Sequence, residues 1–275
     1  MKASSIKSII KECIPPLALK FVQKKFRVSA RYSSYEDAMK YADGYEDEVL
    51  TRVIVAKGKR FVDEIAITKT LDAFSWRTFV GLASSIGKKK LTVIDFGGAA
   101  GTHYFIAKLM LTEVIELDWR IVETSAMVAE AKRQGLETDE LKYFDNIDTA
   151  TEKGDIDLVF ASGSIQYTSK PYDFLAALAS VNADVLMITR APITDSPCVI
   201  LQRSTLFANG GGEIPKELGV DDKTVSYPAT MMDRKKVETI LLSFGEITLK
   251  IVEDKAAYMS DKGSYDTWGF VVRRV

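Results

Sequence analysis

The chain has 275 residues, with 37 lysines and arginines, 38 aspartates and glutamates and a net charge of -1. Because a nearly neutral chain presents no strong overall field to a polyanion, we do not expect nucleic acid as its partner. Hydrophobic residues make up 47% of the sequence, which is enough for the core of one large domain. No stretch approaches the ~20 apolar residues of a membrane-spanning helix. Two scattered cysteines and one histidine predict no metal site and fit a reduced, cytoplasmic protein.

The first third of the sequence is expected to be mostly helical. Its first 26 residues are basic and mildly amphipathic, which allows weak contact with a membrane surface but no stable insertion. The Pro15-Pro16 pair interrupts the apolar runs there and argues against a signal peptide. We expect residues 1–90 to form an N-terminal helical extension or lid, with Tyr41, Gly44 and Tyr45 lying across the site of a domain at 91–275.

From residue 91 onward, strand patterns alternate with helix patterns. The expected strands are LTVIDF, WRIVE, LKYFD, IDLVFAS, ADVLMITR, ITLKIVED and TWGFVVRRV. The helices between them predict a doubly wound α/β fold, and the last two strands, which have no helix between them, predict an antiparallel pair. The expected fold is therefore a mostly parallel seven-stranded sheet with one antiparallel strand near the C-terminal end. The glycine-rich residues 209–219 predict a mobile loop between the fifth strand and the last helix, able to close over a substrate.

A small-residue turn, GGAAG at residues 97–101, follows the first strand of this domain. In doubly wound sheets a ligand lies beyond the carboxyl ends of the strands, and such a turn lets the backbone approach it. Asp95 stands two residues before the turn, so the pattern is not the G-x-G-x-x-G of a dinucleotide site, and the carboxylate would repel a pyrophosphate. A cationic ligand without phosphate, such as S-adenosylmethionine, fits this arrangement. The expected cofactor-binding residues here are Asp95, Gly97, Gly98, Ala99 and Gly101.

A second acid, Glu123, ends the second strand, 28 residues after Asp95. An acid at this place can accept both hydroxyl groups of a ribose, as the corresponding acid does in dinucleotide folds. The alternative is a charge at the strand end, or a cap on the helix that starts near Ser125. We expect the ribose role.

These residues together resemble a known family. The pattern Asp95-x-Gly97-x-Ala99-x-Gly101, with Glu123 and the fourth strand, is similar to class I S-adenosylmethionine-dependent methyltransferases. More narrowly, DFGGAAGTHYF, ASGSIQY and TRAPI resemble a bacterial group of methyltransferases often associated with surface-polysaccharide genes. The resemblance implies the Rossmann-like methyltransferase fold, although Ala99 stands where the common form has a third glycine.

The resemblance also implies roles for individual residues. Asp95 and Gly97 would hold the methionine end of the cofactor and Glu123 its ribose, with Ser162 nearby at the end of the fourth strand. Asp145 or Asn146 would bond the adenine amino group, although an Asp-Asn pair is equally typical of a turn.

Four residues are candidates for the acceptor side of the site. His103 is the only histidine and lies in the first turn of the first helix, where it is either the general base or a structural residue. Tyr167 is a second catalytic candidate that can orient an acceptor or simply pack as an aromatic. Gln166 is expected to bind the substrate, and Arg190 to bind an anionic group or to pair with an acid of the cofactor site.

The sequence therefore predicts an enzyme that methylates a hydroxyl of a small acceptor such as a sugar or sugar precursor, with the sugar resting on the resemblance alone. Two alternatives stay open. One is an NAD(P)-dependent oxidoreductase on the same architecture, and the other is a cofactor-binding scaffold without catalysis. The acceptor atom and the oligomeric state do not follow from the sequence.

Overall fold

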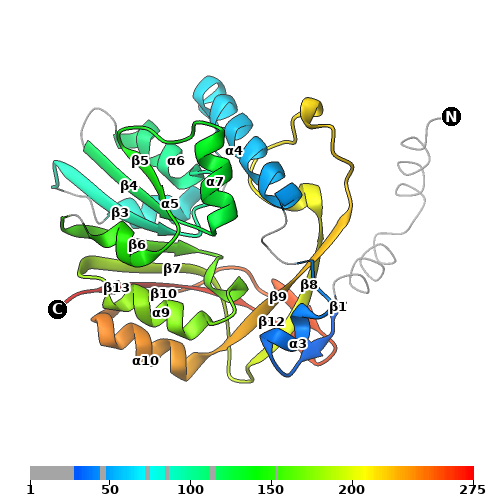
Figure 1. Ribbon diagram of the computed structural model, residues 1–275. Coiled ribbons are helices and arrows are strands. Elements are labelled where there is room, and N and C mark those ends of the chain that lie inside the picture. Colours follow the sequence, from blue (N-terminus) through cyan, green and yellow to red (C-terminus); the bar gives the residue numbers. More distant parts are fainter. Residues whose placement is uncertain (1–27, 44–47, 72–74, 84–86, 112–115, 153) are drawn as a thin grey trace.

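The computed structural model describes residues 28–43, 48–71, 75–83, 87–111, 116–152 and 154–275 (Figure 1). The basic N-terminal segment lies outside the described residues, as do Gly44 and Tyr45 of the expected lid.

A seven-stranded sheet forms the centre of the molecule, in the order β5-β4-β3-β6-β7-β13-β10. Its strands are β3 (Lys90–Phe96), β4 (Glu116–Val122), β5 (Leu141–Phe144), β6 (Ile156–Ser162), β7 (Ala183–Thr194), β10 (Glu246–Val252) and β13 (Thr267–Arg273). β13 runs antiparallel to both of its neighbours, while the other paired strands of this sheet are parallel. The structure therefore confirms the predicted doubly wound, mostly parallel sheet with one antiparallel strand near the C-terminal end.

Helices cover both faces of this sheet and create two cores. One layer contains α4 (Glu48–Thr68), α5 (Trp76–Leu82), α6 (Thr102–Leu111) and α7 (Ser125–Arg133), and the other contains α8 (Ile147–Thr151), α9 (Pro171–Ser180) and α10 (Arg234–Phe244) (Figure 1). Neighbouring residues of β3 point to opposite faces, so Val93 joins the first core and Ile94 the second. The predicted helix starts are also present, since Pro171 opens α9 and the Asp233 carboxylate accepts the Lys236 N–H at the start of α10.

A β-hairpin that the sequence reading missed follows the fifth strand of the core. It consists of β8 (Cys198–Thr205) and β9 (Thr224–Asp233), with β2 (Arg31–Tyr32) paired to β8 and the end of β7 paired to β9. A smaller sheet joins β1 (Val28–Ser29), β11 (Tyr258–Ser260) and β12 (Gly263–Tyr265), and the short helix α3 (Tyr35–Met39) packs near β9. Pro228 in β9 and the polar residues of β8 hide the strand pattern, because proline inside a run argues against a strand.

The glycine-rich segment 209–219 lies between the fifth strand of the core and the last helix, as expected, with β8 before it and β9 after it. It rests against α4. The buried Lys57 Nζ donates to the carbonyl oxygens of Phe207, Asn209 and Gly210 at 2.7, 2.7 and 2.9 Å. A Cβ on Gly212 would lie 2.7 Å from the Lys57 carbonyl oxygen. These contacts tie the segment to the helix.

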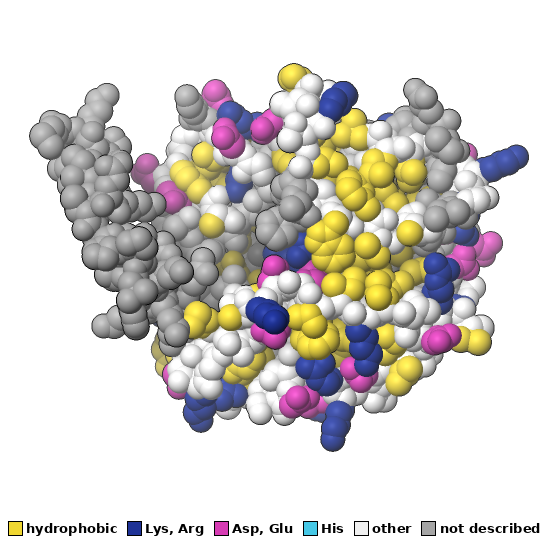
Figure 2. Space-filling model, turned by 180° about the vertical axis from the view of Figure 1, so that it is seen from behind, with side chains coloured by type: hydrophobic (Ala, Val, Ile, Leu, Met, Phe, Trp, Pro, Cys, Tyr) yellow, Lys and Arg dark blue, Asp and Glu magenta, His cyan; other side chains and the backbone are white. Residues whose placement is uncertain are grey.

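In the described part of the chain, no helix is both long and apolar enough to cross a bilayer. Figure 2 shows hydrophobic side chains gathered on the face opposite to that of Figure 1, with charged side chains among them. The exposed large hydrophobic residues of the described chain include Phe79 of α5, Leu109 and Met110 of α6, and Leu249 of the edge strand β10.

Candidate functional site

The turn after β3 has the left-handed backbone that its glycines allow. Gly97 and Gly101 have φ of +73° and +82°. Gly97 donates its N–H to the Val122 carbonyl at 2.8 Å, and a Cβ placed on Gly97 would lie 2.2 Å from the Cβ of Ser164. The absence of a side chain therefore brings the end of β3, the end of β4 and the loop after β6 into direct contact.

Asp95 lies beneath this turn rather than facing solvent. It is 1% exposed, and a Cβ on Gly98 would meet its carboxylate at 2.7 Å. One carboxylate oxygen, Oδ2, accepts a hydrogen bond from Trp119 Nε1 at 3.0 Å, while the buried Oδ1 has no hydrogen-bond partner among the described residues. Burial raises the pKa of Asp95 to about 7, against the opposing Trp119 hydrogen bond and with a smaller contribution from the nearby Glu123 charge.

Glu123 follows β4 and faces the same turn. Its Oε1 accepts the Ala99 N–H at 3.1 Å and its Oε2 accepts the Thr124 N–H at 3.0 Å. Burial raises the pKa of Glu123, and these two backbone bonds oppose the rise. Each carboxylate oxygen keeps a further lone pair that can accept a ligand hydroxyl. The helix cap considered as an alternative role belongs to Thr124, whose hydroxyl accepts from Met127 N.

Ala99 is the residue that departs from the common glycine pattern, and it has a φ of +48°. An alanine in this conformation is strained relative to glycine. The next residue, Ala100, is 3% exposed, and a Cβ placed on Gly58 of α4 would lie only 2.2 Å from the Ala100 Cβ. Helix α4 therefore crosses directly over the turn at Gly58. This contact brings the N-terminal region against the candidate cofactor site.

The two polar residues after β5 differ in what they are free to do. Asn146 caps α8, because its side-chain oxygen accepts from Thr149 N at 2.8 Å, and its Nδ2 donates to Asp145 Oδ1 at 2.8 Å. Asp145 is exposed. The Asn146 side chain is therefore engaged at both its oxygen and its nitrogen, whereas Asp145 keeps one carboxylate oxygen available to a ligand. At the end of β6, Ser162 accepts a hydrogen bond from the buried Thr189 hydroxyl at 2.9 Å.

His103 lies at the start of α6 and faces α5. Its Nδ1 is 2.7 Å from the Thr78 hydroxyl, and its ring meets Phe160 edge-on with 4.8 Å between centroids. Burial, together with the positive charges of Arg190 and Arg77, lowers the pKa of His103 to about 4. The imidazole is therefore neutral at physiological pH and can accept a proton or a hydrogen bond.

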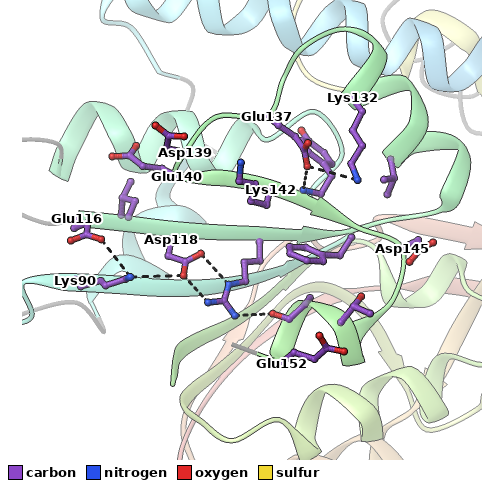
Figure 3. Close-up of a pocket in the computed structure, with 17 residues that line it drawn as sticks. Lys90, Glu116, Asp118, Lys132, Glu137, Asp139, Glu140, Lys142, Asp145 and Glu152 are labelled. Atoms are coloured by element: carbon purple, nitrogen blue, oxygen red, sulfur yellow. Dashed lines mark hydrogen bonds and ion pairs between the residues drawn. The ribbon is translucent and has the colours of Figure 1, made fainter. Parts of the chain in front are cut away.

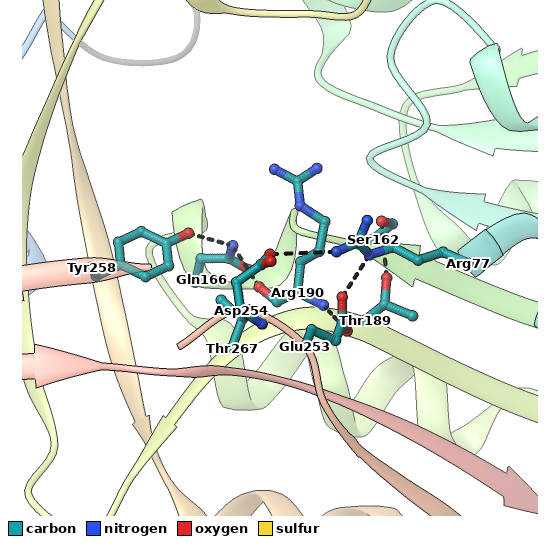
Figure 4. Close-up of polar contacts among 9 residues, drawn as sticks. All are labelled: Arg77, Ser162, Gln166, Thr189, Arg190, Glu253, Asp254, Tyr258 and Thr267. Atoms are coloured by element: carbon teal, nitrogen blue, oxygen red, sulfur yellow. Dashed lines mark hydrogen bonds and ion pairs between the residues drawn. The ribbon is translucent and has the colours of Figure 1, made fainter. Parts of the chain in front are cut away.

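Arg190 occupies an unusual backbone position near the carboxyl end of β7. Its φ is +55°, at a point where the pairing of β7 with β13 is irregular. Its N–H donates to Glu253 Oε1 at 2.7 Å, and its carbonyl accepts from Gln166 Nε2 at 3.3 Å (Figure 4). Glu253 in turn accepts from Arg77 Nε at 2.5 Å in a buried ion pair.

Gln166 and Tyr167 both direct their polar groups toward other protein atoms. Gln166 is 1% exposed and also donates to the Tyr258 hydroxyl at 3.1 Å. The Tyr167 hydroxyl donates to Gln202 Oε1 at 2.9 Å and lies 2.9 Å from the Tyr258 hydroxyl. In this arrangement both residues position neighbouring side chains and backbone, and the sequence-derived roles at the substrate stay predictions.

A groove of about 740 Å³ runs along the edge of the sheet at β4 and β5 (Figure 3). Charged side chains dominate its lining, from Lys90 and Glu116 at the starts of β3 and β4 to Asp145 beyond the end of β5. Glu123 and the turn at 97–101 are not among its lining residues. Because it follows the length of the strands, the groove shares only Asp145 with the predicted site.

Several residues of this site escaped the sequence reading. Arg77 and Glu253 are 176 positions apart, and Thr78, Thr189 and Gly58 lie in helix and strand interiors without a motif. The only available signal was the position of Glu253 at the end of a predicted strand. In the described part of the chain, no group of three or more histidine, cysteine or acidic residues is arranged to hold a metal ion.

No protein-family model and no curated protein matches this sequence. Solved structures with a similar course of the chain include a S-adenosylmethionine-dependent methyltransferase from Clostridium acetobutylicum, with 11% identity, 78% of this chain and 96% of that chain covered and a TM-score of 0.47. The N-terminal domain of EvdMO1 with SAH bound has 16% identity, coverage of 73% and 81% and a TM-score of 0.44. The sugar N-methyltransferase KedS8 from a Streptoalloteichus species has 17% identity, coverage of 78% and 92% and a TM-score of 0.41. At such values the function has to be argued from the residues of this chain.

Proposed function

We propose that this protein is an S-adenosylmethionine-dependent methyltransferase that acts on a hydroxyl group of a small acceptor. One observation carries the proposal: two carboxylates, Asp95 and Glu123, flank a backbone turn at the carboxyl ends of β3 and β4. Neither has an ion-pair partner among the described residues, and their pKa values are raised. A ligand with positive charge relieves this excess of negative charge, whereas a pyrophosphate would add to it.

The residues present fit the parts of such a cofactor. The Glu123 carboxylate, held by Ala99 N and Thr124 N, accepts the ribose hydroxyls. The backbone of 97–99 and the charge of Asp95 beneath it hold the methionine end, and Gly98 lets the Asp95 carboxylate lie directly against the turn. Asp145, the freer of the two polar residues after β5, accepts from the adenine amino group, and Ser162 bounds the methionine side. The same carboxylates argue against an NAD(P)-dependent oxidoreductase.

When bound, S-adenosylmethionine supplies a methyl group that is open to attack by a nucleophile. The chain's contribution is to align the acceptor and to take up the hydroxyl proton. His103 is neutral and its Nδ1 lies 2.7 Å from the Thr78 hydroxyl; in the tautomer whose Nδ1–H donates to Thr78, Nε2 can accept that proton. The N-terminal helix α4, which touches the turn at Gly58, acts as the cover of the cofactor. The acceptor class that we favour is a sugar or sugar precursor. We place the reaction in the cytoplasm.

Calorimetry with S-adenosylmethionine and S-adenosylhomocysteine tests the cofactor. We expect both to bind, and Asp95→Ala and Glu123→Ala to weaken both. Absence of binding at millimolar concentration overturns the proposal. Unaltered binding in both variants contradicts the site assignment.

The role of His103 needs a separate measurement. His103→Ala is expected to slow methyl transfer to a screened hydroxyl acceptor while cofactor affinity is retained. Near-normal turnover in this variant removes His103 from the mechanism, whereas cofactor binding without transfer to any acceptor in a broad screen favours a scaffold.

A further inference from the structure

Arg190 differs from Arg77, the arginine paired nearby, in having no partner for its charge among the described residues. The Arg77 guanidinium is committed to Glu253 and Asp254, at 2.5 and 3.5 Å. The Arg190 guanidinium makes no hydrogen bond or ion pair within the described part of the chain, and the residue is exposed. In Figure 4 it points away from Glu253 and Asp254, and none of the interactions drawn reaches it.

The backbone of Arg190 is held in a strained conformation by other parts of the protein. Non-glycine residues with positive φ are uncommon, and such conformations persist where surrounding contacts determine them. Here Glu253 binds the N–H, Gln166 binds the carbonyl, and the buried ion pair with Arg77 fixes Glu253. Gly269 of β13 leaves room for this carboxylate, since a Cβ there would lie 2.9 Å from Glu253 Oε1. Three segments of the chain therefore hold one arginine in place.

The side chain of Arg190 also lies close against the backbone of a glycine. Gly163, which follows β6, has a φ of +65°, and a Cβ placed on it would lie 3.0, 3.1 and 3.2 Å from Cζ, Nε and one terminal nitrogen of Arg190. A Cβ at 163 would force the guanidinium to shift by a few tenths of an ångström. Glycine therefore lets the planar group lie close against the backbone at this position.

The position of Arg190 relative to the proposed cofactor site indicates what it binds. Across the sheet, Asp145, Glu123 and the turn at 97–101 follow β5, β4 and β3 in that order. Beyond them come β6 and then β7, which carries Arg190. A cofactor extended over β5, β4 and β3 places its reacting end toward β6 and β7. His103 lies next to the same strands, because its ring meets Phe160 of β6 edge-on with 4.8 Å between the ring centroids.

We propose that Arg190 binds an anionic group, a carboxylate or a phosphate, on the methyl acceptor. This inference rests on the proposed function and narrows its substrate class to a hydroxylated acid or phosphate ester. The same chemistry could come from the carboxylate of the cofactor itself, and the experiment distinguishes the two sources.

The test uses the full chain and pyrophosphate as the probe, with and without saturating S-adenosylhomocysteine. We expect pyrophosphate to bind the complex and Arg190→Gln to weaken it at least tenfold, with S-adenosylhomocysteine affinity unchanged. Arg190→Gly is the folding control, because glycine accepts the positive φ and should be at least as stable while binding as poorly. Arg273→Gln is the matched control. Arg273 is an exposed arginine that pairs with Val185 at the opposite end of β7, so binding should be unaffected.

Each other outcome overturns the inference in a distinct way. If Arg190→Gln and Arg273→Gln weaken pyrophosphate equally, or neither does, the anion is held elsewhere. If Arg190→Gln weakens S-adenosylhomocysteine and pyrophosphate competes with it, Arg190 serves the cofactor carboxylate. If S-adenosylhomocysteine does not bind the wild type, the proposed function fails, and pyrophosphate binding to the free protein still tests Arg190 as an anion site.

Discussion

The candidate site has an acidic half after β3 and β4 and a basic half in β7. Both halves lie toward the carboxyl ends of the parallel strands of one sheet. At the ends of β3 and β4, Asp95 and Glu123 have raised pKa values and no cationic partner among the described residues. In β7, just after its pairing with β6 stops at Thr189, Arg190 presents a cation with no anionic partner among the described residues, and Arg77 is paired nearby. The acidic half attracts a cationic ligand and repels an anionic one, and the basic half does the reverse. One side of the sheet can therefore separate two ligands by their charge.

Among the changes in the acidic half, Glu123→Ala is expected to have the largest effect on the affinity for S-adenosylmethionine. Loss of a charged acceptor for two hydroxyl groups should remove about 3 kcal/mol, or about 100-fold in affinity for S-adenosylmethionine. Calorimetry measures this change. Glu116→Ala, at the exposed start of the same strand, is the matched control and should leave the affinity unchanged. An equal loss in both variants would mean that Glu123 acts only through general electrostatics or folding.

Gly58→Ala tests the contact between α4 and the turn. In an ordinary helix this change stabilises, but here the new Cβ would lie 2.2 Å from the Ala100 Cβ. We expect a loss of about 2 kcal/mol in the free energy of unfolding, together with weaker cofactor binding. Gly81→Ala on α5 is the control, because its nearest neighbour would be at 3.4 Å, an ordinary contact. A stabilised Gly58→Ala protein would show that α4 does not press on the turn.

The pH dependence of cofactor binding provides a third test. Because the pKa of Asp95 is raised to about 7, a cationic ligand has to drive a proton from it in acid solution. The affinity for S-adenosylmethionine should therefore rise about tenfold from pH 6 to pH 8, accompanied by proton release in calorimetry. Asp95→Asn should lose this slope. A slope that survives the substitution would assign the titration to another group.

Asp95 and His103 change the stability of the folded protein with pH in opposite directions. The Asp95 pKa is raised from 3.8, so its contribution to stability is full below pH 3.8 and is lost as the pH rises through about 7. The His103 pKa is lowered from 6.5, so its contribution is full above pH 6.5 and is lost as the pH falls through about 4. Asp95→Asn should therefore be relatively more stable, compared with wild type, at pH 8 than at pH 5 in urea unfolding.

The smallest effect is expected from Ala99→Gly. Glycine relieves the positive φ of +48° but adds freedom to the unfolded chain, so the net gain in stability should be about 0.5 kcal/mol. Cofactor affinity should be retained, since the Ala99 N–H that Glu123 accepts is still present. Ala100→Gly, which has no positive φ and loses the contact at Gly58, should instead destabilise the protein. Thermal unfolding of the two variants distinguishes them by sign.

The acidic half could be predicted from the sequence because its signals are local. Asp95 and Glu123 each end a buried strand, and alternation of strands and helices brings such ends to one edge. The basic half could only partly be predicted. Arg190 was visible at a strand end, but the ion pair that fixes it joins residues 77 and 253, and no local pattern reports such a contact. The hairpin of β8 and β9 was missed for a related reason, since its strands are recognised by pairing rather than by apolar runs.

Strand β7 belongs to two parts of the molecule at once. Up to Thr189 it pairs with β6 in the central sheet, and at Ile193 and Thr194 it pairs with β9 of the hairpin. Arg190 lies between these two stretches, at the irregularity opposite β13. Arg190 therefore lies where the backbone of β7 joins the hairpin to the central sheet. An acceptor held by its guanidinium would lie at the junction of these two parts of the fold.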